Sequence, residues 1–229
     1  MKVVVIAAHP DDEILGCGAT MAKHAKNGDQ VFVHILAEGI TSRDEKRDRS
    51  KHKNKLLELE KAAEAANKLL SVSSLTLHDL PDNRMDSLDR LDIIKVIEKI
   101  ISEDQPDIIY THHIGDVNID HRRIHEAVVT ACRPFPDHHH VRELLFFEVL
   151  SSTEWQPPGS APAFQPNWYV DVSDTLDKKL KALNEYDGEM RDWPHARSIS
   201  AVNYLAKLRG ANIGVEAAEA FILGRKIVK

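Results

Sequence analysis

The chain has 229 residues, 42% hydrophobic and 29% charged, which is enough to bury one substantial core. Its formal net charge of −6 leaves no overall electrostatic footprint for nucleic acid or an anionic membrane, so any anionic ligand must be met locally. Cys17 and Cys132 are too few for a disulfide framework and too isolated for a thiolate zinc site. We expect a protein without a nucleic-acid partner.

The N-terminal apolar run is short. It covers residues 3–8, far less than a secretory segment or a membrane span needs. We therefore expect a cytoplasmic protein with no membrane insertion.

The first two thirds of the chain alternate apolar strands with helical patterns. The segment "KVVVIAAH" is nearly all apolar, as a strand covered on both faces should be, and "EILGCGATMAKHAKNG" follows with helical spacing. Further strands are predicted at "QVFVHILAEG", "VSSLTLHDLPD", "PDIIYTHH" and "ELLFFEVL", and further helices at "KLLELEKAAEAANKLL", "SLDRLDIIKVIEKIISED" and "DHRRIHEAVVTACRP". Strands separated by helices of this length imply right-handed crossovers. The sequence predicts a three-layer α/β/α, Rossmann-like fold around a mostly parallel sheet.

The texture changes after about residue 150. The segment "SSTEWQPPGSAPAFQPNWYVDVS" is rich in proline and predicts an irregular excursion that ends in a short strand. Helices are predicted at "DTLDKKLKALNEY" and "ISAVNYLAKLRG", and the tail "VEAAEAFILGRKI" is mixed in period. We expect one domain over residues 1–229, in which a core of residues 1–150 carries an α/β excursion of residues 151–229.

Histidine and aspartate concentrate at two predicted strand ends. Open parallel sheets bind ligands at the carboxyl ends of their strands, which selects the loops at residues 9–13, 38–43 and 112–121. The first and third of these loops, with the start of the following helix, hold His9, Asp11, Asp12, His112, His113, Asp116, Asp120, His121 and His125. The sequence predicts that any chemistry lies where these loops meet.

A zinc site fits these residue types. Imidazole and carboxylate ligands together suit zinc, and a catalytic site takes three protein ligands, for which His9, Asp12 and His121 would serve. Asp11 is the spare carboxylate and our choice for the general base. Helix capping is the alternative explanation of the acidic residues, although it gives no reason for His9. A solvated helix face is the alternative explanation of His121 and of His125, which follows one turn later.

The same residues resemble a known family. "AHPDDE" after a first strand, with a later "DH" at the start of a helix, resembles the PIG-L/LmbE-like zinc N-deacetylases, which remove acetyl groups from N-acetylglucosamine-type sugars and their conjugates. The resemblance implies one Zn²⁺ per chain, held by His9, Asp12 and His121, with Asp11 as general base. It also implies a homo-oligomer, often a trimer or hexamer.

One position departs from the family pattern. Many members carry "HPDH", whose first histidine stabilises the oxyanion or protonates the leaving amine, whereas this chain has "NIDH" with Asn118 there. An amide can donate a hydrogen bond to an oxyanion but cannot act as an acid near neutral pH. We expect Asn118 to assist the oxyanion, and His195 to donate the proton, with His113 and Asp116 as alternatives. Asp11 could also return the proton itself.

Substrate contacts are less visible in the sequence. Arg43 is the first basic residue of the basic segment 41–55 and could hold a phosphate. The alternative is that this segment is only a solvated loop. Arg197 is a second possible anion contact, and Asp120, placed to orient an imidazole, is counted with both arginines among the substrate-site residues. The late aromatic residues Trp155, Trp168, Tyr169 and Trp193 could stack on a sugar or simply pack.

Two other functions remain compatible with part of the pattern. A phospho-receiver domain would use the Asp pair to bind magnesium, with Asp79 as phosphoacceptor, but it would leave His9 and His121 unused. The fold could also bind a sugar or nucleotide without turnover, which the complete set of ligands and base argues against. "DHHH" at residues 137–140 suggests a metal site but lies away from the selected loops, so we expect a surface loop there.

Overall fold

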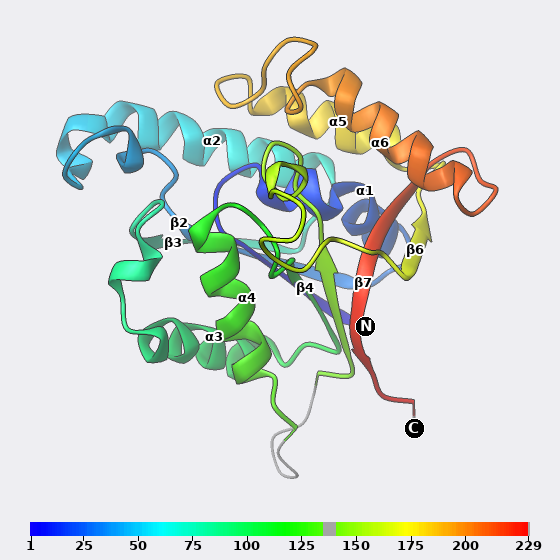
Figure 1. Ribbon diagram of the computed structural model, residues 1–229, viewed down its shortest axis with the longest axis horizontal. Helices are drawn as coiled ribbons and strands as arrows, with labels where there is room; N and C mark the ends of the chain where they lie inside the picture. The colour runs from blue at the N-terminus through cyan, green and yellow to red at the C-terminus, as the bar shows by residue number, and fades with distance from the viewer. Residues whose placement is uncertain (135–140, 229) are drawn as a thin grey trace.

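A seven-stranded sheet forms the centre of the molecule (Figure 1). The structure, a computed structural model, describes residues 1–134 and 141–228, so the segment "DHHH" lies outside the described residues. The strand order is β3-β2-β1-β4-β5-β7-β6. In chain order the strands are β1 (Lys2–Ala7), β2 (Gln30–Ala37), β3 (Ser74–Leu80), β4 (Ile108–His112), β5 (Glu143–Phe147), β6 (Trp168–Asp171) and β7 (Ala218–Lys226).

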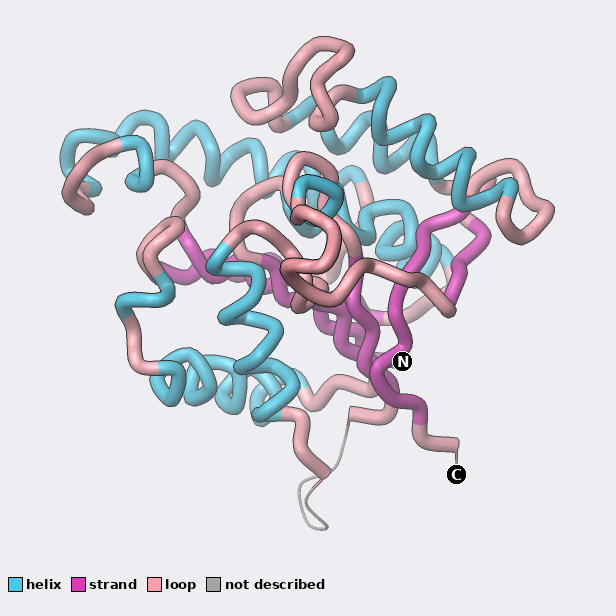
Figure 2. The backbone as a smooth tube through the Cα atoms, viewed as in Figure 1, coloured by secondary structure: helices cyan, strands magenta, loops and turns pink. Residues whose placement is uncertain are grey.

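Helices cover both faces of this sheet, as the smooth tube in Figure 2 shows. They are α1 (Asp12–Lys26), α2 (Lys53–Leu69), α3 (Arg90–Asp104), α4 (Ile119–Ala131), α5 (Leu176–Glu185) and α6 (Ile199–Ala211). Short 3₁₀ turns lie at η1 (Thr41–Arg43), η2 (Arg49–His52), η3 (Met85–Ser87) and η4 (Thr153–Trp155). Within the described residues, no helix is both long and apolar enough to cross a membrane.

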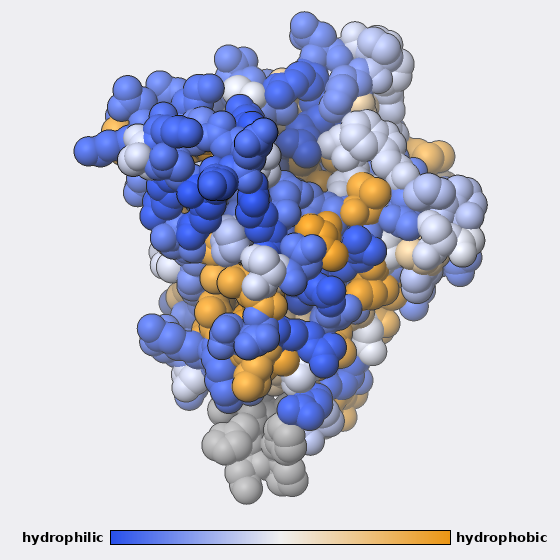
Figure 3. Space-filling view, turned by 60° about the vertical axis from the view of Figure 1, so that its left-hand side comes forward, coloured by the Kyte–Doolittle hydropathy of each residue, from blue (hydrophilic) through white to orange (hydrophobic). Residues whose placement is uncertain are grey.

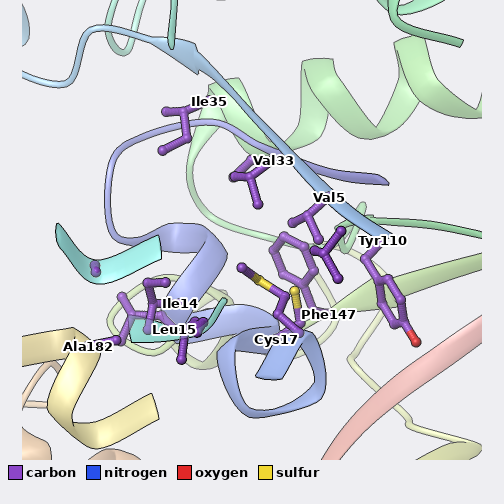
Figure 4. Packing of buried hydrophobic residues seen from close by; sticks show 14 of the residues in the cluster. Val5, Ile14, Leu15, Cys17, Val33, Ile35, Tyr110, Phe147 and Ala182 are labelled. Atoms are coloured by element: carbon purple, nitrogen blue, oxygen red, sulfur yellow. The ribbon is translucent and has the colours of Figure 1, made fainter. Parts of the chain in front are cut away.

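The alternating side chains of β1 explain the three layers. Val3 and Val5 face one apolar cluster, to which α1, α2, α5 and α6 contribute, and Val4 and Ile6 face a second cluster built with α3 and α4. Figure 4 shows the first cluster, in which Phe147 packs close to Cys17 of α1. A strand buried on both faces reads as a continuous apolar run, which is why β1 is clear in the sequence.

Pairing of the strands confirms the predicted fold class. β1 pairs in parallel with β2 and β4, and the parallel pairing continues from β2 to β3 and from β4 to β5. β7 is antiparallel to β5 and β6, and no strand was predicted there. Its residues 218–221 are all buried whereas most of the later ones are not, so the strand shows neither alternation nor a uniform apolar run.

Candidate active site

The site lies at the switch point of the sheet, between β1 and β4, where the strand order reverses. β1 is followed in space by β2 on one side and by β4 on the other, so the loops after β1 and β4 diverge and leave a crevice between them. A pocket of about 510 Å³ opens there, and its lining includes His9, Asp11, Asp12, Asn118 and His121. Its volume lies in the range of about 300–1,000 Å³ usual for ligand pockets.

The two predicted histidine ligands lie next to one carboxylate oxygen of the third predicted ligand, Asp12. Oδ2 of Asp12 lies 3.1 Å from Nδ1 of His9 and 3.0 Å from Nε2 of His121. One ligand atom from each residue lies within 4.8 Å of the others, as a shared ion requires. Nε2 of His121 is buried and, despite its short distance to Asp12, makes no hydrogen bond of acceptable geometry. Because buried polar atoms are normally partnered, this nitrogen and the mixed N and O donors fit a divalent metal.

Two further carboxylates also lie next to His9. Asp120 Oδ2 lies 3.0 Å and Asp82 Oδ1 3.3 Å from its Nε2 atom. Both carboxylates already accept other hydrogen bonds: Asp120 from the amides of Asn83 and Met85, and Asp82 from the amide of Ser42 and the side chain of Asn83. The unpartnered nitrogen therefore favours the set that contains Asp12 and His121 as the metal site.

Asp116 holds the other side of His121. Its Oδ2 lies 3.1 Å from His121 Nδ1, and it accepts hydrogen bonds from Ser152, Thr153 and the amide of Asn118. Burial lowers the pKa of His121, but Asp12 and Asp116 outweigh it and raise that pKa to about 9. A carboxylate on Nδ1 fixes the ring with Nε2 facing the ligand cluster, as in carboxylate–histidine–metal arrangements.

Asp11 lies beside the ligands in an unusual backbone conformation. Its φ of 107° is in the left-handed region, which costs a residue with a side chain on the order of 1–3 kcal/mol. Its amide donates to Glu13 Oε2 at 3.0 Å, and Arg197 donates to its Oδ2 at 2.9 Å. Burial raises the pKa of the Asp11 carboxyl, while Arg197 opposes that shift. Asp11 thus has the burial and position expected of a base.

Glu13, the last residue of "AHPDDE", holds the turn that contains Asp11. It is fully buried, and its Oε1 accepts hydrogen bonds from the Tyr186 hydroxyl at 2.6 Å and from Asn67 Nδ2 at 2.9 Å. Helices α2 and α5, the latter just before Tyr186, thereby fix the turn that presents Asp11. This role of Glu13 was not predicted, because a carboxylate in the first helical turn looks like a simple cap.

Asn118 caps α4 at the edge of the pocket. Its Oδ1 accepts from the amide of Asp120 at 2.9 Å, and its Nδ2 donates to Asn83 Oδ1 at 2.9 Å. Since an amide NH₂ carries two hydrogens, one remains for a ligand.

The three candidate proton donors lie outside the pocket lining. His195 is exposed and accepts from the amide of Arg197, with its ring edge-on to Trp155. His113 forms a hydrogen bond through Nε2 to the carbonyl of Pro162, and Asp116 contacts Nδ1 of His121. A proton-donor role for His195 therefore stays a prediction.

The three residues predicted to contact substrate already have partners within the protein. Arg43 reaches the pocket edge but pairs with Glu189 at 2.9 Å, and Arg197 pairs with Asp11. Asp120 is fully buried against His9, so it orients an imidazole and has no exposed surface for a substrate. It orients His9, on the neighbouring strand end, and not the adjacent His121. Asp82 was missed because the strand-end rule was not applied to the loop after β3.

Three of the seven Lys and Arg residues of the basic segment 41–55 form ion pairs. Arg47 pairs with Glu38 at 2.9 Å, and Arg49 pairs with Asp79 at 2.9 Å. Figure 3, which brings this side of the molecule forward, shows a mainly hydrophilic upper half. These contacts favour the solvated-loop interpretation over a phosphate site, and they place Asp79 in surface ion pairs on an edge strand.

Sequence comparisons identify one family and two curated relatives. The profile of the GlcNAc-PI de-N-acetylase (PIG-L) family matches residues 4–132. The chain is 30% identical over 190 residues to the uncharacterized deacetylase YaiS of Escherichia coli (strain K12), covering 80% of this chain and 89% of that protein. It is 28% identical over 225 residues to diacetylchitobiose deacetylase of Thermococcus kodakarensis, covering 91% and 79%.

Solved structures share the fold. N,N'-diacetylchitobiose deacetylase from Pyrococcus horikoshii has a TM-score of 0.78 at 21% identity, covering 98% of this chain and 84% of that one. GalB, the 4-carboxy-2-hydroxymuconate hydratase of Pseudomonas putida KT2440, has a TM-score of 0.76 at 21% identity, covering 100% and 98%. Because a hydratase shares this fold, the reaction must be argued from the site and the family.

Proposed function

The chain belongs to the GlcNAc-PI de-N-acetylase (PIG-L) family of hydrolytic deacetylases, and from this premise we propose that it hydrolyses the N-acetyl group of an N-acetylglucosamine-type sugar or sugar conjugate, releasing acetate. The observation that carries the proposal is the buried, unpartnered Nε2 of His121 facing Asp12, with His9 completing the set and Asp11 beside it. Membership of this family removes the phospho-receiver alternative.

His9, Asp12 and His121 would hold one Zn²⁺ per chain. Bound there, such an ion supplies Lewis acidity that polarises an amide carbonyl and lowers the pKa of water. Asp120 and Asp116 each hold one imidazole from its far side, so that the opposite nitrogen faces the shared site.

Asp11 acts as the general base in this proposal. Its carboxylate takes the proton of the attacking water, while Arg197 orients it through the 2.9 Å contact and opposes the rise in its pKa that burial causes. The free hydrogen of Asn118 Nδ2 is available to the developing oxyanion. Because His195 is outside the pocket lining, we assign to Asp11 the return of the proton to the leaving amine.

The remaining expectations concern partners and surroundings. An N-acetylated sugar is the proposed partner, and the lining residues suit it because carboxylates, an amide and an indole can meet hydroxyl groups and ring faces. A homo-oligomer, trimer or hexamer, and a cytoplasmic location remain predictions.

Replacing Asp11 by Asn tests the proposal. The variant should bind zinc as the wild type does, because Asp11 is not a ligand, while acetate release from N-acetyl sugars falls by roughly 10²–10⁴-fold. Zinc quantification and an acetate assay give the two readouts. Asp177→Asn, on the exposed surface of α5, is the matched control and should change neither. Unchanged acetate release in Asp11→Asn would remove Asp11 from the mechanism.

A further inference from the structure

The exposed aromatic rings of the described chain gather beside the pocket. Within residues 1–134 and 141–228, the exposed Trp, Tyr and Phe side chains are Trp155, Trp193 and Tyr204, at 53%, 60% and 57%. Trp155 lines the pocket, Trp193 precedes α6 and Tyr204 lies on it. Exposed aromatic groups that cluster mark a binding surface more often than isolated ones do.

Contacts link these rings to the pocket wall. The ring of Trp155 lies 5.8 Å from that of His195, and Trp193 lies 5.5 Å from Tyr204, both edge to face. Trp193 and His195 belong to one turn, closed by the hydrogen bond from the His195 amide to the Asp192 carbonyl. We call Trp155, His195, Trp193 and Tyr204 the aromatic row.

The aromatic row is fixed to the catalytic residues. Arg197, two residues after His195, donates to Ser151 Oγ at 3.0 Å and to Asp11 at 2.9 Å. The turn that carries Trp193 and His195 is therefore anchored both to the loop that carries Trp155 and to the proposed base. A ligand that leaves the pocket past Trp155 meets the rest of the row.

Charges in the pocket argue for an uncharged ligand. The two arginines of its lining, Arg43 and Arg197, are both paired with carboxylates, and the lining also contains Asp82, which is not among the proposed metal ligands. A phosphate would have to break one of these pairs and would approach further carboxylates.

We propose that the aromatic row binds sugar rings beyond the one that is deacetylated, so that the preferred substrates are uncharged N-acetylated oligosaccharides. The inference rests on the proposed deacetylase function and adds the length and charge of its substrate. One face of a pyranose ring presents C–H groups with partial positive charge, which suit the negative face of an aromatic ring. Trp155 takes the first ring outside the pocket, and Trp193 with Tyr204 takes the next.

Chain-length dependence of acetate release tests this assignment. The kcat/KM is measured for N-acetylglucosamine, for its oligomers of increasing length and for its nucleotide diphosphate conjugate. The wild type should prefer the neutral oligomers. Trp155→Ala and Trp193→Ala should each lower the ratio of kcat/KM for a long oligomer to that for the monosaccharide by about two- to tenfold, mainly through KM. Leu91→Ala, an exposed apolar change on α3, is the control and should leave the ratio unchanged.

Calorimetric binding of the oligomers to the same variants separates the two proposals. Acetate release with an unchanged length ratio in both tryptophan variants overturns the aromatic row and leaves the deacetylase function standing. Oligomer binding that Trp155→Ala weakens, without acetate from any substrate, supports the row and contradicts the deacetylase function. A change of oligomeric state in Trp193→Ala with an unchanged ratio would make the row a contact between copies of the chain and overturn the proposal. Preference for the nucleotide conjugate would also overturn it.

Discussion

The conformation of Asp11 shows how strain and function meet in one residue. A left-handed backbone is unfavourable for aspartate, yet it turns the chain so that Asp11 faces the pocket while Asp12 faces the two histidines. The hydrogen bond from its amide to Glu13, and those from Tyr186 and Asn67 to Glu13, are fully buried. Buried hydrogen bonds of this kind contribute about 1 kcal/mol each and offset the strain.

Asn118 combines a structural and a proposed chemical role, and one substitution separates them. Asn118→Ser keeps a side-chain oxygen that can cap α4 but removes the amide hydrogens. We expect the free energy of unfolding to change by less than about 1 kcal/mol while kcat falls by up to about 10²-fold, because one donor to the oxyanion is lost.

Denaturant unfolding and initial rates measure the two effects. Asn118→Ala serves as the comparison, since it should lose the cap as well and become about 1 kcal/mol less stable. Wild-type kcat in Asn118→Ser would contradict the oxyanion role.

At the scale of elements, α1 is interrupted behind the site. Cys17 has non-helical angles, so the amides of Ala19 and Thr20 lack ordinary helical partners and instead donate to Glu219 of β7. Lys179 of α5 donates to Glu219 at 2.6 Å and to the carbonyl of Leu15 at 2.8 Å. A buried ion pair thereby joins three elements at the break.

Removing the cation of this pair should destabilise the protein strongly. Lys179→Met would leave Glu219 charged and buried, and breaking a buried pair in this way costs about 3–5 kcal/mol of unfolding free energy. Denaturant unfolding measures the loss.

Lys95→Met is the matched control. It breaks the exposed pair of Lys95 with Glu98 and should cost less than about 1 kcal/mol. Equal losses in the two variants would show that the buried pair has no special weight.

The elements also show what a sequence can reveal. β1, β2 and β4 are mainly apolar, and the rule that ligands gather at strand ends brought His9, Asp12 and His121 together correctly in space. β7 escaped prediction because its buried part is short and its neighbours come from distant segments.

The tertiary contacts of the site were less predictable. Arg197 and Asp11 are 186 positions apart, and no periodicity signals their contact. His195 was chosen by residue type, but it is exposed and outside the pocket lining, which its place in the sequence does not reveal. Asp120 illustrates the same limit, since its partner is a histidine on another strand end and not its neighbour in sequence.

At the scale of the whole molecule, the fold assembles one site from both ends of the chain. The segments that follow β1 and β4 supply the proposed ligands and the proposed base, while the segment after residue 150 contributes Ser152, Trp155 and Arg197 to the pocket. This late segment also adds β6 and β7 to the same sheet. The core thus carries the chemistry, and the late segment shapes access to it.

The central claim is that His9, Asp12 and His121 hold one metal ion without which the hydrolysis does not occur. Stepwise addition of Zn²⁺ to the metal-depleted protein, with acetate release from an N-acetylated chitooligosaccharide as readout, tests it most directly. We predict negligible release at the start and a linear rise that ends at about one equivalent per chain. Full acetate release from the metal-depleted protein would contradict the account.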